Sequence, residues 1–209
     1  MKRSLSAGQV LQVRNQTLQI SPEWQGCLGD EIARHGIVFI WGNSGNGKSS
    51  AVMSFAKMLS AYGKVLYVSK EEGYGFSFQN TLRRFSMTEC GKAFQVADKE
   101  TVESLTERLD KARSPEFVVI DSVQAMGIGS RTFKELRERY SNKLLVLVSQ
   151  ADGKRPLGRA AQNMMYEADL KLWVEGYTVF SKGRFMGPTK EYVTWEEGAK
   201  LYWEGRKKE

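Results

Sequence analysis

The sequence predicts an α/β fold with a mostly parallel central sheet that helices cover on both faces. Short apolar runs without polar alternation recur up to about residue 150, which is typical of strands buried on both faces. Each run is followed by a segment with apolar residues at helical spacing, so strands and helices alternate along the chain. After residue 168 the runs become shorter and are joined by turns, which indicates an antiparallel extension at one edge of the sheet.

The alternating part of the chain and its extension contain the following expected elements. Continuous apolar runs predict strands at residues 37–41, 65–68, 94–96, 117–120 and 144–148. Apolar residues three and four positions apart predict helices at residues 48–61, 78–85, 102–109 and 133–140. The extension is expected to contain short strands at residues 170–174, 177–181, 192–195 and 201–203.

A chain of 209 residues is long enough for one domain with a sizeable core. We expect residues 28–204 to form this domain and residues 205–209 to form a basic tail. Residues 1–27 lack sustained periodicity, so we expect a linker or an arm that docks onto another copy of the chain.

The composition excludes several classes of protein. No apolar stretch approaches the roughly 18–20 residues that cross a bilayer, and the N-terminus lacks the apolar segment of a secretory signal. Cys27 and Cys90 are the only cysteines, which excludes a disulfide framework and a four-cysteine zinc site. We therefore expect a cytoplasmic protein without a membrane partner. Its net charge of +7 favours polyanionic partners, although nucleotide phosphates alone account for part of this preference.

A glycine-rich loop connects the first predicted strand to the first predicted helix. Its residues 42–49 fit the pattern G-x-x-x-x-G-K-[ST], and the strand and helix on either side favour a phosphate site over a turn that matches by accident. Inward-turned backbone N–H groups and the helix N-terminus attract anions. We expect Lys48 to reach the β- and γ-phosphates of ATP and Ser49 to bind Mg²⁺. The expected nucleotide-binding residues are Gly42, Asn43, Ser44, Gly45, Asn46, Gly47, Lys48, Ser49 and Ser50.

Polar residues follow three other strands, and the carboxyl ends of parallel strands meet at one edge of a sheet. Asp121 is predicted to hold Mg²⁺ through water, with a helix N-cap as the alternative. Glu71 is the favoured base for the attacking water, and Glu72 is its support or substitute, unless both are solvated loop residues. Gln150 is expected to respond to the γ-phosphate, or else to be an ordinary polar strand end.

Two basic segments suggest larger partners. The loop at residues 151–159 carries glycines and a net positive charge, so it is expected either to contact a nucleic-acid backbone or to be a solvated loop. Residues 182–185 lie between two late strands, far from the phosphate loop in sequence. Lys182 and Arg184 are expected to reach the nucleotide of a neighbouring subunit, with solvated charges that protect a sheet edge as the alternative.

The order of these motifs resembles the RecA-like ATPase core of the RadA/Sms family over about residues 28–204. The matching segments are GNSGNGKS (42–49), VLYVSKEE (65–72), VVIDSVQ (118–124), LVSQ (147–150) and KGRFMGPTKE (182–191). The resemblance implies that Glu71 is the catalytic glutamate, that Asp121 is the Walker B aspartate, and that Lys182 and Arg184 act across the subunit boundary. The zinc module and the C-terminal protease-like domain of that family have no counterpart here, so we expect a minimal core.

The sequence and the resemblance together predict a Mg²⁺-dependent ATPase. The resemblance implies a homo-oligomeric ring, such as a hexamer, that couples ATP hydrolysis to binding, translocation or remodelling of single-stranded DNA in recombination and repair. Two other interpretations stay open. One is a KaiC-like or recombinase-like ATPase that forms filaments, or a helicase accessory protein. The other is an ATP-regulated scaffold with little turnover.

Overall fold

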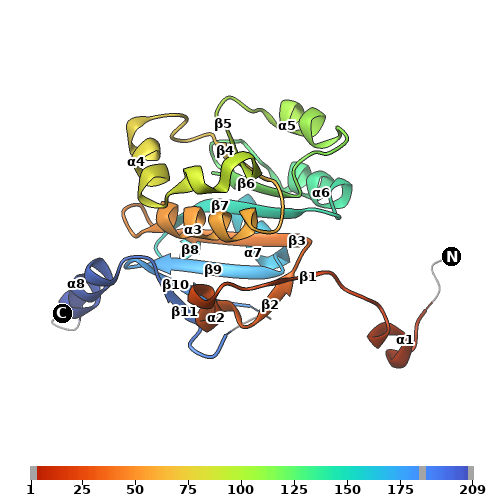
Figure 1. Ribbon diagram of the computed structural model, residues 1–209, viewed down its shortest axis with the longest axis horizontal. Coiled ribbons are helices and arrows are strands. Elements are labelled where there is room, and N and C mark those ends of the chain that lie inside the picture. Colours follow the sequence, from red (N-terminus) through yellow and green to blue (C-terminus); the bar gives the residue numbers. More distant parts are fainter. Residues whose placement is uncertain (1–3, 184–186, 207–209) are drawn as a thin grey trace.

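A mostly parallel β-sheet forms the centre of the chain in this computed structural model, which describes residues 4–183 and 187–206 (Figure 1). Its strand order is β11-β10-β9-β3-β7-β6-β4-β5, and β8 pairs with β7 outside this path. The strands are β3 (Gly36–Gly42), β4 (Val65–Ser69), β5 (Phe94–Ala97), β6 (Phe117–Asp121), β7 (Leu144–Asp152), β8 (Arg155–Pro156), β9 (Leu170–Glu175), β10 (Thr178–Ser181) and β11 (Glu191–Val193). The predicted α/β class and its parallel sheet are confirmed.

The parallel register aligns the carboxyl ends of β3, β4 and β6 with the part of β7 that contains Gln150. Ser69 at the end of β4 pairs with Asp121 at the end of β6. Gly42 at the end of β3 pairs with Gln150 of β7. The backbone ladder therefore brings the glycine-rich loop, the acid after β6 and the amide of β7 to the same edge of the sheet.

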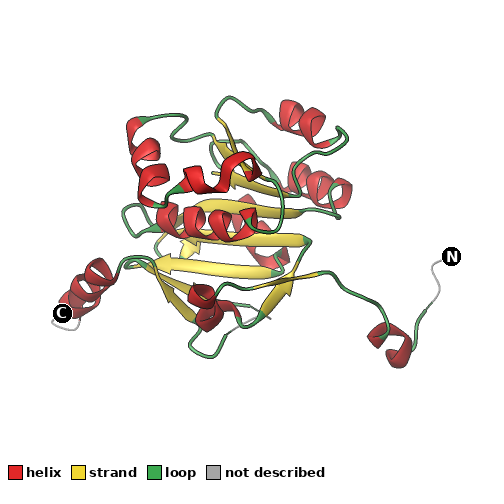
Figure 2. Ribbon diagram, viewed as in Figure 1, coloured by secondary structure: helices red, strands yellow, loops and turns green. Residues whose placement is uncertain are grey.

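Helices cover both faces of the sheet, as Figure 2 shows. The face that Val38 and Ile40 share with Phe55 is covered by α2 (Pro22–Leu28), α3 (Lys48–Ser60), α4 (Phe76–Arg84) and the 3₁₀ helix η1 (Met87–Ala93). The opposite face, which includes Phe39, is covered by α5 (Val102–Leu109), α6 (Ser130–Arg139) and α7 (Arg159–Glu167). Adjacent residues of β3 thus enter different cores, which explains its continuous apolar run.

The packed domain begins earlier than the expected boundary at residue 28. Strands β1 (Thr17–Gln19) and β2 (Glu31–Ala33) form a small antiparallel sheet on either side of α2. Leu18, Trp24 and Cys27 are buried in the same core as α3. The Trp24 indole donates a hydrogen bond to Ser54 Oγ at 3.1 Å. The segment before β1 contains the short helix α1 (Ala7–Leu11), which extends away from the body (Figure 1).

The C-terminal extension is antiparallel, as expected, but it begins one strand later. Strand β9 pairs in parallel with β3, and β10 and β11 then add in antiparallel order. The strand expected at residues 201–203 is wrong, because these residues lie in α8 (Glu196–Arg206). Acidic residues in its first turn and an arginine in its last turn complement the helix dipole, whereas a three-residue apolar run does not distinguish a strand from a helix.

The loop expected at residues 151–159 is ordered. Strand β7 continues to Asp152, turns at Gly153 and pairs with β8, and α7 follows. Gln150 therefore lies within β7 and not at its end. None of the helices in the described part of the chain combines the length and apolarity that crossing a bilayer requires.

Candidate nucleotide site

The glycine-rich loop between β3 and α3 forms a cradle that leads into the N-terminus of the helix. Gly45 and Gly47 have φ angles of 75° and 88°, in the left-handed region that glycine adopts without strain. Helix α3 begins directly after Gly47, and no side chain caps its N-terminus. The first N–H groups of this helix therefore lack a capping partner and are available to an anion.

This cradle opens into a pocket of about 370 Å³. The lining residues come from the loop, the start of α3 and the ends of β4 and β6: Asn43, Ser44, Gly45, Gly47, Lys48, Ser49, Ser50, Glu71, Glu72 and Asp121. The pocket thus brings together most of the residues that were expected to bind nucleotide and metal. Gly42 and Asn46 do not line it, and they hold the loop in place instead.

Gly42 and Asn46 fix the loop against the turn between β9 and β10. A Cβ atom on Gly42 would lie 2.4 Å from the carbonyl oxygen of Val174, so only glycine fits between the two strands. Asn46 Oδ1 accepts a hydrogen bond from the Gly176 N–H at 2.9 Å, and the Asn46 carbonyl accepts one from the Tyr177 N–H at 3.0 Å. The cradle is therefore anchored to the antiparallel end of the sheet.

A second set of contacts ties the loop to the hairpin of β7 and β8. The Asn43 side-chain amide donates to the Gly153 carbonyl at 2.9 Å. The Trp41 indole, at the end of β3, donates to the Lys154 carbonyl at 3.1 Å. The basic hairpin and the phosphate cradle are thus in direct contact.

Asp121 lies at the bottom of the pocket, where Tyr67 orients it. The fully buried Tyr67 hydroxyl donates to Asp121 Oδ2 at 2.5 Å. Burial raises the pKa of Asp121, and the nearby negative charge of Glu71 raises it further. The Tyr67 hydrogen bond and the Lys48 charge lower the pKa, but the net shift is upward. An ionised Asp121 therefore favours a cation at this position.

Glu71 and Gln150 are in direct contact. Gln150 Nε2 donates to Glu71 Oε1 at 2.7 Å, which joins the segment after β4 to β7 beside the phosphate cradle. Glu72 also lines the pocket, but its carboxylate accepts a hydrogen bond from the hydroxyl of Ser77 in α4. The geometry therefore distinguishes the two carboxylates, and Glu71 is the one that is linked to β7.

The donor set fits a magnesium ion that takes most of its ligands from phosphate and water. Ser49 and Asp121 supply a hydroxyl and a carboxylate, which are oxygen ligands of the kind that Mg²⁺ prefers. The described residues contain no group of three or more His, Cys, Asp or Glu that is placed to hold a metal ion by itself. The site thus fits Mg²⁺ bound together with a nucleotide.

Sequence reasoning missed two residues of this site. Tyr67 belongs to a continuous apolar run that reads as core, although a buried tyrosine hydroxyl needs a partner and an acid lies at the end of the neighbouring strand. Arg84 of α4 donates to Ser50 Oγ at 2.8 Å and brings a positive charge to the pocket rim. No motif identifies Arg84, because its position depends on how α4 packs beside α3.

The residues expected to act across subunits lie apart from this pocket. Lys182 follows β10 and lines a separate pocket of about 310 Å³ together with Lys154, Lys190 and Trp203. Arg184 lies outside the described residues. Lys182 is therefore directed toward a different surface from the nucleotide site of its own chain.

The sheet, the glycine-rich loop and this pocket define a RecA-like P-loop fold. Two solved structures share the fold. One is the flagellar accessory protein FlaH from Methanocaldococcus jannaschii, with a TM-score of 0.64 and 13% identity over 85% of this chain and 93% of that one. The other is a KaiC-like protein from Pyrococcus horikoshii OT3, with a TM-score of 0.60 and 17% identity over 86% of this chain and 99% of that one. At these identities the likeness concerns the fold alone.

Sequence comparison adds relatives with a higher identity than these two structures. The chain is 30% identical over 112 residues to DNA repair protein RadA of Streptococcus pneumoniae, a match that covers 54% of this chain and 26% of the relative. It is 32% identical over 106 residues to RadA of Listeria monocytogenes, covering 50% of this chain and 22% of the relative. No protein-family model matches. The predicted resemblance to RadA is confirmed over about half of this chain, which spans about a quarter of the length of these relatives.

Proposed function

We propose that this chain hydrolyses ATP with Mg²⁺ and couples hydrolysis to single-stranded DNA. The observation that carries the proposal is the pocket in which the P-loop, Glu71 and Asp121 converge, with Glu71 held by Gln150 at 2.7 Å. A base, a cation ligand and an anion cradle in one place are the parts that phosphoryl transfer to water requires.

The proposal assigns three roles in the pocket: holding the triphosphate, holding Mg²⁺ and activating water. The N–H groups at the start of α3 and the Lys48 ammonium hold the triphosphate. Ser49 and Asp121 would hold Mg²⁺, which neutralises charge on the phosphates. Glu71 orients a water molecule toward the γ-phosphate and accepts its proton, while the Gln150 amide keeps the carboxylate in position.

The proposed assembly is a homo-oligomeric ring such as a hexamer. Lys182 does not line the pocket of its own chain, which leaves it available to the nucleotide of a neighbour. We extend the same role to Arg184, so that both cations stabilise transition-state charge across the subunit boundary. A repeated head-to-tail contact closes into a ring when its rotation closes.

The proposed DNA contact is the hairpin of β7 and β8. Its turn carries Lys154 and Arg155, both exposed cations, and the curated relatives are named as DNA repair proteins. The hairpin touches the nucleotide site twice, because Asn43 holds the Gly153 carbonyl and Gln150 holds Glu71. Loss of the γ-phosphate would therefore change the position of the hairpin through these two hydrogen bonds.

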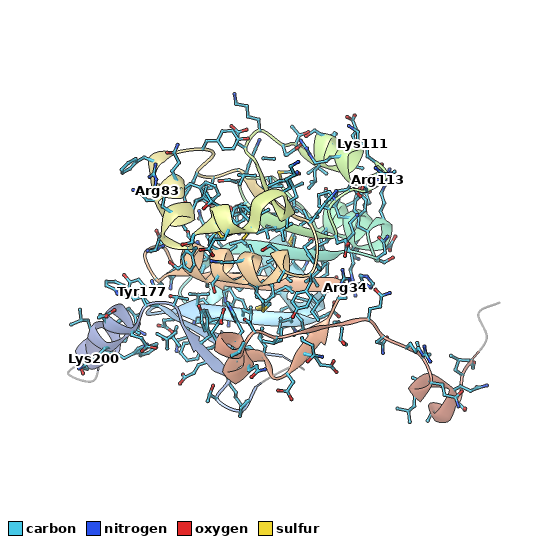
Figure 3. All side chains as sticks on the ribbon, in the orientation of Figure 1. Arg34, Arg83, Lys111, Arg113, Tyr177 and Lys200 are labelled. Carbon is cyan, nitrogen blue, oxygen red and sulfur yellow. The ribbon has the colours of Figure 1, made fainter. Side chains whose placement is uncertain are left out.

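A double variant, Lys154→Ala with Arg155→Ala, tests the DNA contact. We expect weaker binding of single-stranded DNA, a salt slope reduced by about one unit for each phosphate that is no longer neutralised, and no increase of ATP turnover when DNA is added. The matched control is Lys111→Ala with Arg113→Ala, two exposed cations near α5 (Figure 3). Equal DNA affinity in both double variants would exclude the hairpin as the DNA-binding element.

A second candidate is an accessory ATPase that acts on a protein partner. It is favoured by the shared fold with FlaH, which is named as a flagellar accessory protein, and by the short turn of the hairpin, which offers few cations to DNA. This candidate predicts ATP turnover that does not respond to DNA at any salt concentration. The DNA titration above therefore separates the two proposals.

A further inference from the structure

A groove of about 770 Å³ lies between α8 and the last two strands of the sheet. Its lining is mostly apolar, and the apolar side chains are those of Phe180, Val193, Ala199 and Trp203. It lies outside the P-loop pocket, and the proposed hydrolysis does not use it. A groove of this kind, walled by one helix and floored by strands, suits an apolar helix face.

The N-terminal arm, residues 4–16, presents apolar side chains to solvent. Helix α1 starts with a capping box between Ser6 and Gln9, yet none of its residues is buried. More than half of each large apolar side chain is exposed at Leu5, Val10, Leu11 and Val13. An isolated helix of five residues is unstable in water, so local capping does not explain this segment without a surface that covers it.

The arm and the groove lie at opposite ends of the molecule (Figure 1). Residues 12–16 connect α1 to β1, and five residues extend by at most about 18 Å. Figure 1 shows this connector leading away from α8, and Figure 3 places Lys200 of α8 at the far side of the body. The arm of one chain is therefore presented to the groove of another.

The charges of the two surfaces are complementary. Residues 1–22 contain Lys2, Arg3 and Arg14 and no acidic residue. The groove carries three glutamates, namely Glu191, Glu196 and Glu204, against Lys200 and Arg206. Arg206 forms an ion pair with Glu175 beside the groove. The sequence up to residue 16 thus carries only positive charges, with Arg14 in the described arm, whereas the groove lining has an excess of negative charge.

We propose that the arm of one copy docks into the α8 groove of a second copy, head to tail. The apolar side chains of α1 cover Phe180, Val193 and Trp203, and Arg14 of the arm faces the glutamates at the rim. Because the two surfaces differ, the contact repeats from copy to copy and gives a ring or an open chain. The inference deepens the proposed function, since it supplies a contact for the proposed oligomer.

A peptide of residues 1–16 with a fluorescent label tests the docking directly. The receptor is the full chain with Leu11→Gln, so that its own arm competes weakly. We expect saturable binding, weakened at least tenfold by the double substitution Glu191→Lys with Glu204→Lys. The matched control reverses two exposed glutamates elsewhere, Glu107→Lys on α5 and Glu138→Lys on α6. No binding, or equal affinity for the two double variants, would overturn the proposal.

Mass measurement of the full chain with a slowly hydrolysed ATP analogue gives a second test. Leu11→Gln, which leaves the packed core intact because Leu11 is 86% exposed, should raise the concentration needed for assembly at least tenfold. Leu157→Gln, at another exposed leucine, should assemble like the wild type. Assembly of Leu11→Gln at wild-type concentrations, or a wild-type chain that stays monomeric, would overturn the docking. ATP turnover is measured separately, so failure here leaves the hydrolysis proposal to its own test.

Discussion

The two halves of the sheet are held together differently. In the half made by β3, β7, β6 and β4, parallel ladders fix where each strand ends, and the P-loop, Asp121 and Gln150 follow from the register. At the other end of the sheet, antiparallel ladders hold β9, β10 and β11 together, whereas side chains attach α8 to them. Glu175 accepts hydrogen bonds from Trp173 at 3.1 Å and Tyr202 at 3.2 Å and pairs with Arg206.

This difference shows how a functional site and a docking surface place different demands on a fold. A backbone ladder tolerates the loss of one side chain, so it suits the precise spacing that a phosphate site needs. A surface held by a few polar and aromatic side chains loosens when one of them is removed. Substitutions in the first half should therefore change strand packing or the affinity of the pocket for its ligands. Substitutions in the second half should change how well ordered α8 is.

Gly42→Ala should give the largest change in stability. Its Cβ atom would lie 2.4 Å from the Val174 carbonyl oxygen, so β3 and β9 must move apart. We expect the free energy of unfolding to fall by about 2–3 kcal/mol, measured by denaturant titration. The control is Gly205→Ala in α8, where an added Cβ meets open space and alanine favours the helix by at most about 1 kcal/mol. Equal stability of the two variants would contradict the strand-packing argument.

Tyr67→Phe should weaken the metal site by about tenfold while the pocket keeps its shape. The substitution removes only the hydroxyl that orients Asp121, and loss of such a supporting hydrogen bond lowers metal affinity by about ten- to a hundredfold. The measurement is the Mg²⁺ concentration for half-maximal binding of a fluorescent ATP analogue. Tyr62→Phe, which removes a hydroxyl bonded to the Gln19 carbonyl, is the control. An unchanged Mg²⁺ requirement in Tyr67→Phe would rule out the positioning role.

Glu175→Gln should have the smallest effect, confined to the α8 end. Loss of the ion pair with the half-exposed Arg206 should lower the stability of α8 by about 1 kcal/mol or less. Hydrogen exchange should then be faster in α8, while β6 keeps the wild-type rate. Exchange that increases equally in β6 would show that the two halves unfold as one unit.

The same carboxylate gives a pH dependence. Burial raises the pKa of Glu175, but hydrogen bonds from Trp173, Tyr202 and Arg206 and the arginine charge outweigh burial, so the pKa is lowered. A lowered pKa in the folded state stabilises α8 above the unfolded value of about 4.3, and the stabilisation is lost as pH falls through the lower folded value. The protection of α8 against hydrogen exchange, taken relative to the intrinsic exchange rate at each pH, should therefore fall in acid in the wild type and depend less on pH in Glu175→Gln.

The sequence predicted the structure well where the position of a residue along a strand determines its position in the sheet. The apolar run that ends at Asp121 predicts both a buried strand and an acid at the sheet edge, and both are found. The apolar pattern of the sequence failed to predict the structure where tertiary packing determines it. Residues 201–203 form part of α8, and the buried Trp24 lies within the segment expected to be an arm. The positions of Tyr67 and Arg84 depend on contacts with distant residues, which a single sequence does not encode locally.

The most direct test is steady-state ATP turnover with Mg²⁺ in the wild type, Lys48→Ala and Glu71→Gln, with binding of an ATP analogue measured in parallel. Removing the Lys48 charge should lower turnover about a hundredfold or more and weaken nucleotide binding, because the proposed function places the ammonium beside the phosphates. Glu71→Gln should bind the analogue normally and fail to hydrolyse ATP. A wild-type rate no higher than that of Lys48→Ala would contradict the assignment of this pocket as an ATP-hydrolysing site.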